Sequence, residues 1–159
     1  RRGHPVAIHS ASHKYNQIYT SEQAFFDDLE QMNSIIKAQT GNDASIIRFP
    51  GGSSNTVSKD YCPGIMTQLV NDVTARGLLY CDWNVSSGDA NSKPISTEQV
   101  VQNVISGVQS HNVSVVLQHD IKDFSVNAVE QIIQWGQANG YTFLPLTTSS
   151  PMSHHRVNN

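Results

Sequence analysis

The sequence has little charge and no long apolar run, and each shortage argues against a class of protein. Charged residues make up 14% of the chain and the net charge is −3, without any basic run. A nucleic-acid partner is therefore not expected. No apolar stretch approaches the roughly 20 residues that a membrane-spanning helix needs, so we expect no transmembrane segment.

Cysteine is also scarce. The two cysteines, Cys62 and Cys81, have a spacing that matches no zinc knuckle or CxxC redox motif. Two interpretations stay open, because pairing cannot be deduced from sequence. Both residues are unpaired, partly buried thiols, or they form one disulfide, which a secreted protein would permit.

Neutral polar residues are abundant, as is common in extracellular proteins and on surfaces that contact carbohydrate. The length of 159 residues predicts one domain with a real core. We expect residues 1–150 to form this domain. Residues 151–159 are expected to form a Ser/Asn-rich tail in which His154 and His155 are solvated.

Short apolar runs alternate with helical patterns along the chain, which predicts βαβ units and a parallel sheet. Strands are expected at 6–9, 45–49, 78–83, 113–117 and 142–144. Helices are expected between them, two of which begin at the capping boxes Thr20/Gln23 and Ser96/Gln99. Five strands are few for a closed barrel, and the first begins almost at the chain start, so the predicted sheet lacks a piece.

Polar residues follow several of these strand runs, where α/β folds place their chemistry. His9 and His13 are four residues apart at a strand end and could bind one metal ion, or they could be two surface histidines. A catalytic zinc site usually has three protein ligands, so a third would be needed.

Arg48 ends another strand run and must be paired, either with a functional carboxylate or in a structural ion pair. Gly51 permits close backbone approach to a ligand oxygen, although a simple turn is commoner. His119 follows an apolar strand and suits acid–base work, with Asp89 as a partner that would stabilise its charged form. Trp83 could form the floor of a sugar site or belong to the core.

Four segments together resemble the polysaccharide deacetylase family with the NodB-type fold. His9-Ser-Ala-Ser-His13 resembles the family's His-[Ser/Thr]-x-x-His metal motif, and Arg48-Phe-Pro50 its Arg-x-Pro motif. The segment Trp83–Ala90 resembles the one that carries an acid-tuning Asp, and Leu117-Gln-His119 the Leu-x-His motif with the catalytic acid. The four occur in the family's order over essentially the whole chain.

The resemblance implies a distorted parallel (β/α) barrel and a metal-dependent hydrolase. Such an enzyme removes N-acetyl groups from N-acetylglucosamine units of peptidoglycan or a chitin-like polysaccharide outside the cell, so we expect a secreted or cell-surface protein. His9 and His13 would bind a divalent metal, zinc or else Co²⁺ or Ni²⁺. The roles implied for the other residues are general acid for His119, tuning of that acid for Asp89, support of the base for Arg48, and substrate contacts for Gly51, Leu117 and Trp83.

The chain departs from the family at three places. Gly51 stands where an aromatic residue is frequent, and Ala90 where Trp is frequent, which leaves the substrate groove more open. The family's Asp-Asp run, which supplies the base and the third metal ligand, is absent; Asp27-Asp28 has the wrong neighbours. We therefore expect a barrel incomplete at its N-terminus that is inactive alone. The alternatives are a non-catalytic glycan-binding remnant and an O-acetyl xylan esterase.

Overall fold

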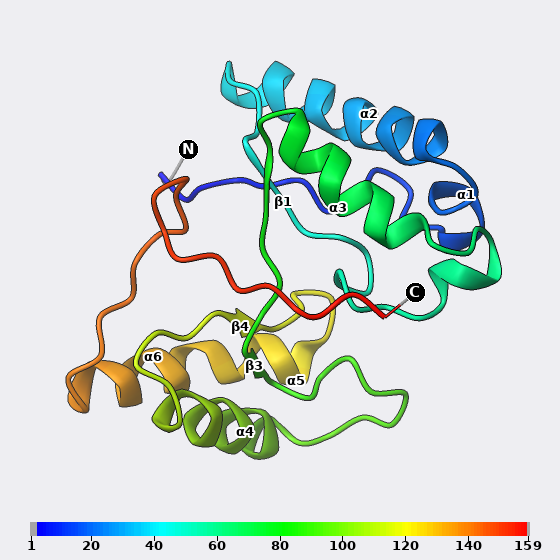
Figure 1. Ribbon diagram of the computed structural model, residues 1–159. Coiled ribbons are helices and arrows are strands. Elements are labelled where there is room, and N and C mark those ends of the chain that lie inside the picture. The colour runs from blue at the N-terminus through cyan, green and yellow to red at the C-terminus, as the bar shows by residue number, and fades with distance from the viewer. Residues whose placement is uncertain (1–2, 159) are drawn as a thin grey trace. The chain divides into compact units, whose positions relative to one another are not determined.

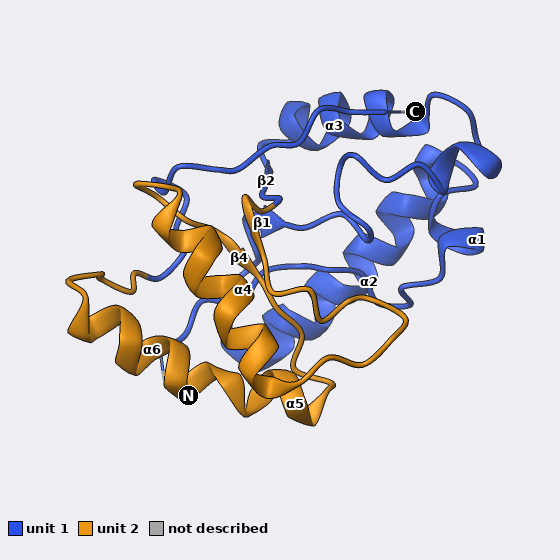
Figure 2. Ribbon diagram, turned by 90° about the horizontal axis from the view of Figure 1, so that it is seen from below, with its two compact units in different colours: residues 1–82, 145–159 blue, residues 83–144 orange. Residues whose placement is uncertain are grey.

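A computed structural model describes residues 3–158 and divides them into two compact units (Figure 2). The first unit contains the chain up to Asp82 together with the segment from Pro145 onward. The second unit is Trp83–Leu144. Each unit contains one two-stranded parallel sheet and its own helices, so the α/β class predicted from sequence is confirmed.

The first unit is built from helices packed beside a short parallel sheet. Its elements are α1 (Tyr15–Ile18), α2 (Glu22–Thr40), β1 (Ile46–Ile47), η1 (Ser58–Asp60), α3 (Ile65–Ala75) and β2 (Leu79–Tyr80). In the sheet Ile46 lies opposite Leu79, and Ile8 forms a parallel bridge to Ile47. The strand expected at 6–9 is therefore reduced to this single bridge.

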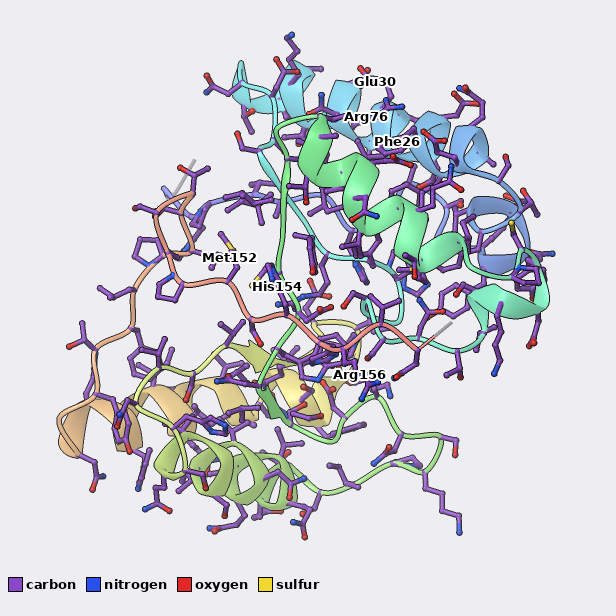
Figure 3. The ribbon with its side chains drawn as sticks, in the orientation of Figure 1. Phe26, Glu30, Arg76, Met152, His154 and Arg156 are labelled. Atoms are coloured by element: carbon purple, nitrogen blue, oxygen red, sulfur yellow. The ribbon has the colours of Figure 1, made fainter. Side chains whose placement is uncertain are left out.

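Helices α2 and α3 lie side by side (Figure 1), and their apolar faces fill the core of the first unit. The predicted spacing of Ile65, Leu69 and Val73 is confirmed, since all three are buried. The guanidinium of Arg76, just past α3, lies 3.5 Å from the centroid of the Phe26 ring on α2 (Figure 3). This cation–π contact joins the two helices at their solvent edge.

The ends of α2 follow from its capping residues. Ser21, not Thr20, is the N-cap: its backbone is extended and its hydroxyl accepts a hydrogen bond from Ala24 N at 3.1 Å. The Thr20 hydroxyl instead donates to Gln17 O at 2.8 Å. Gly41 ends the helix at φ 82°, a left-handed conformation that glycine adopts without steric cost.

The second unit places two parallel strands against three helices. Its elements are β3 (Val85–Ser86), α4 (Thr97–Gln109), β4 (Val116–Leu117), α5 (Asp123–Val126) and α6 (Ala128–Ala138). Val85 lies opposite Val116, and Ser86 opposite Leu117. The predicted cap at Ser96 is confirmed by a hydrogen bond from Gln99 N at 3.1 Å. Val100, Val104 and Ala128 form the centre of the core.

Several predicted strands are wrong in extent or existence. The run 113–117 forms only β4, and Val113 is 56% exposed rather than buried. Residues 142–144 form no strand; the Phe143 ring lies against Gly136 of α6, and its backbone enters no ladder. Strand β3 was not predicted, since Val85–Ser86 has no apolar run around it.

The segment after residue 150 is not a solvated tail. Its backbone lies along the end of β2, where Asp82 N donates to Ser153 O at 2.7 Å. The ring of His154 (Figure 3) stacks on Tyr80 with centroids 3.9 Å apart. The expectation of a solvated residue is wrong for His155, which is half-buried and whose N donates to Asp82 Oδ2, whereas His154 is exposed as expected.

The two cysteines are separate thiols in the first unit, with Cys81 buried and Cys62 half-buried. Of the two open interpretations, the structure thus has the unpaired one. Within residues 3–158, no helix combines the length and the apolar character needed to cross a membrane.

Candidate functional site

The first group of predicted site residues lies around the loop that follows the Ile8 bridge. His9 Nδ1 lies 3.0 Å from the carbonyl oxygen of Arg48. Because a carbonyl can only accept, Nδ1 carries the proton of this hydrogen bond. The rings of His9 and His13 are neighbours, with centroids 4.9 Å apart.

This arrangement fits one side of a metal site. A metal-binding imidazole commonly donates its other N–H to a carbonyl or carboxylate, as His9 does, and this fixes the ligand nitrogen. However, no cluster of three or more His, Cys, Asp or Glu side chains suited to a metal occurs in residues 3–158. His9 and His13 would therefore be two ligands of a site whose third ligand the described residues do not supply.

Arg48 and Gly51 lie on the loop that follows β1. The Arg48 guanidinium donates to two backbone carbonyls at the end of β2, from Nε to Cys81 O at 3.0 Å and from Nη2 to Asp82 O at 3.1 Å. Gly51 is exposed and has φ 77°. A Cβ at this position would lie 2.7 Å from Tyr15 Oη, so both conformation and space require glycine there.

Asp82, which was not predicted as a site residue, binds the loop that follows β1 through hydrogen bonds to its carboxylate. Its buried carboxylate accepts from Ser53 N at 2.8 Å, Ser53 Oγ at 2.5 Å and His155 N at 2.9 Å. The His155 ring in turn lies 3.0 Å from Ser54 Oγ. The sequence offered one sign of this role, since Asp82 is an acidic residue at the end of an apolar strand run. The hydrogen-bond partners of Asp82 could not be inferred, because they lie far away along the chain.

The second group lies at the ends of β3 and β4, in the second unit. His119 Nδ1 lies 2.8 Å from Asp89 Oδ1, and His119 N donates to Asp89 Oδ2 at 2.7 Å. The predicted hydrogen-bond contact between these residues is confirmed. Ser125 Oγ also donates to Asp89 Oδ2 at 2.5 Å, and Lys122 Nζ donates to the Asp89 carbonyl.

These contacts decide the protonation of Asp89. Burial of the carboxyl raises its pKa, but hydrogen bonds from Ser125 and from the side chain and backbone of His119 outweigh burial and lower the pKa to about 2. Asp89 is therefore ionised at neutral pH and accepts the Nδ1 proton of His119. The Nε2 atom of His119 is then the ring nitrogen available for proton transfer, and the side chain is one-third exposed.

The remaining predicted residues lie in the same second unit. Leu117 is half-buried in β4, and its carbonyl accepts from Ser87 N at 3.0 Å. Trp83 is half-buried just before β3. The structure thus brings together His9, His13, Arg48 and Gly51 in one unit, and Asp89, His119, Leu117 and Trp83 in the other.

Comparisons with known proteins agree with these motifs. A family model described as polysaccharide deacetylase matches residues 1–62. A peptidoglycan-N-acetylglucosamine deacetylase from Bacillus cereus is 29% identical over 145 residues, which are 89% of this chain and 50% of that protein. The chain thus spans about half the length of the curated relative it matches.

Solved structures give a stronger match. The catalytic domain of a peptidoglycan N-acetylglucosamine deacetylase from Eubacterium rectale is 98% identical, with a TM-score of 0.99 over 99% of this chain and 72% of that one. A CE4 esterase from Streptococcus mutans is 28% identical, with a TM-score of 0.74 over 91% of this chain and 64% of that one. The chain belongs to the polysaccharide deacetylase family.

Proposed function

We propose that this chain carries part of the active site of a metal-dependent hydrolase. Its reaction would remove N-acetyl groups from N-acetylglucosamine units of peptidoglycan or a chitin-like polysaccharide. The observation that carries the proposal is the hydrogen-bonded pair His119–Asp89 at the strand ends, in a chain 98% identical to a named deacetylase domain. Because such polymers lie outside the cytoplasm, the protein would be secreted or held at the cell surface.

His119 has the position and the partner of a general acid. Asp89 fixes the ring through Nδ1 and the backbone through the amide, so Nε2 points its proton in one direction. In its protonated form, His119 would give that proton to the amine that leaves the acetyl carbon. Asp89 stays ionised during this step, because its low pKa keeps the proton on the imidazole.

The first unit would bind and polarise the acetyl group. His9 and His13 would hold a divalent ion, zinc in our proposal, which would supply polarisation of the acetyl carbonyl and activation of a water molecule. Gly51 is exposed, and its N–H donates no hydrogen bond to a group of residues 3–158. It would therefore be available to the oxyanion that forms when the carbonyl is attacked. Arg48 braces this loop against the end of β2.

A base and a third metal ligand are needed to complete this reaction, and the 159 residues contain no Asp-Asp run of the family type. We propose that both come from sequence outside these residues, together with the strands that would close the NodB-type barrel. The share of the curated relative that the chain spans, 50%, leaves room for such a segment.

The test is acetate release from acetylated chito-oligosaccharides and from peptidoglycan, using the protein in its full natural length with Zn²⁺ added. We expect acetate release whose rate His119→Gln lowers by about 10²–10⁴-fold and His111→Gln leaves unchanged. His111 is a matched control, because its Nδ1 contacts only the Gly107 carbonyl at the end of α4. Binding of the glycan without acetate release would favour a glycan-binding module, and acetate release from acetylated xylan alone would favour the esterase.

A further inference from the structure

The loop between His9 and His13 receives its shape from one carboxylate on a neighbouring helix. Asp28, in α2, accepts from Ser10 Oγ at 2.5 Å, Ala11 N at 2.8 Å and Ser12 N at 2.9 Å. These are the three consecutive residues between the two histidines. No other side chain of residues 3–158 donates to or accepts from so much of this loop.

The loop needs such support because its backbone is strained. Ser10 has φ 108° and His13 has φ 53°, and residues with a Cβ rarely adopt positive φ. Conformations of this kind persist only where the surroundings hold them, and they gather at functional sites. The Ser10 hydroxyl links both strained positions, since it donates to Asp28 and accepts from His13 N at 2.9 Å.

Asp27, the preceding residue on the same helix, does not bind the loop between the histidines as Asp28 does. Its carboxylate is exposed and accepts only from Gln23 Nε2, at 2.6 Å and one helical turn away. Successive helix residues point about 100° apart, so only one of the two can face the loop. Asp27-Asp28 is therefore not a misplaced copy of the family's Asp-Asp run.

Asp28 is also not a spare metal ligand. Three of the roughly four lone-pair sites on its two oxygens already accept hydrogen bonds, two on Oδ2 and one on Oδ1. Ligation through Oδ2, or through both oxygens, would require breaking hydrogen bonds that keep the strained loop in place. The carboxylate can therefore serve the metal site by holding the residues that bear the ligands.

We propose that Asp28 is a positioning residue that sets the mutual placement of His9 and His13 for one divalent ion, without binding that ion itself. The inference rests on the proposed metal dependence. It adds a residue in α2, outside all the segments that carry the resemblance to the family. Similar partners of metal ligands typically contribute about 10–100-fold to metal affinity.

The test is metal affinity in the full natural chain, measured by competition of Zn²⁺ and Co²⁺ with a chromophoric chelator. Asp28→Asn keeps the size of the side chain but turns an amide donor toward the loop N–H groups. We expect about a 10–100-fold loss of affinity in this variant and none in the matched control Asp27→Asn. The melting temperature of the metal-free Asp28→Asn variant should fall only slightly. The loss of metal affinity is then not a loss of the fold.

A second variant tests the same loop without changing Asp28, so that misfolding of Asp28→Asn cannot decide the result. Ser10→Ala removes the hydroxyl that links Asp28 to His13 N, and it should also weaken metal binding, whereas Ser34→Ala on the exposed side of α2 should not. Equal affinity in wild type, Asp28→Asn and Ser10→Ala would overturn the positioning role alone. Absence of metal binding in the wild type would remove the proposed metal site and this inference with it.

Discussion

Replacing Asp89 by Asn should remove a pH-dependent part of the stability of the second unit. The Asp89 side chain is 1% exposed and accepts hydrogen bonds from Ser125 and from two groups of His119. Burial raises the pKa of the carboxyl, but these donors lower it from 3.8 to about 2. A carboxyl with a lower pKa in the folded chain stabilises the fold above the unfolded pKa. That contribution is lost as the pH falls through the folded value.

The lowering of the pKa from 3.8 to about 2 corresponds to about 2.5 kcal/mol of stability at neutral pH. Urea unfolding of wild type and Asp89→Asn between pH 7 and pH 2 measures it. The difference in unfolding free energy should be constant above about pH 5 and shrink by about 2 kcal/mol between pH 5 and pH 2, with the rest lost below pH 2. Other carboxyls titrate in both proteins and cancel. A difference that stays constant down to pH 2 would refute the reasoning.

Three further outcomes are expected. His119→Gln should lower the rate of acetate release by about 10²–10⁴-fold while metal affinity stays unchanged; a fall in metal affinity would contradict the role of acid. Gly51→Ala places a Cβ 2.7 Å from Tyr15 Oη at a positive φ, so kcat should fall by about 10–100-fold, and adding Tyr15→Phe should recover part of it. The 159-residue chain alone should release no acetate even with metal, as mass-verified preparations can show, because it lacks the Asp-Asp run.

Local signals predicted the helices of this chain well and the strands poorly. Caps and apolar spacing act within four residues, so Ser96 and the buried face of α3 could be identified directly. A strand needs a partner from elsewhere in the chain. Residues 142–144 have the composition of a strand, yet Phe143 packs on α6 and no neighbour pairs with its backbone.

The candidate site shows the same division. The proximity of Asp89 and His119 could be predicted, because each follows a strand and parallel strands end at one edge of a sheet. The link from Asp82 to His155 could not, since 73 residues separate them and the tail carries no apolar pattern. Asp28 was set aside because Asp27-Asp28 has the wrong neighbours for the family's Asp-Asp run, and only the structure shows that its carboxylate binds the loop of residues 10–12.

Three carboxylates in the described chain have the same hydrogen-bonding pattern, and this pattern helps to decide which residue could be the general base. Asp28, Asp82 and Asp89 each accept three hydrogen bonds on their two oxygens, all from residues at least 16 positions away. A base must offer a lone pair to a water molecule and bind its proton readily near neutral pH. Carboxylates that accept three hydrogen bonds have few lone pairs left for a water molecule, and a pKa of about 2 makes Asp89 a particularly weak base. In the proposed reaction all three would therefore hold loops in place, and the base would be a carboxylate outside these networks.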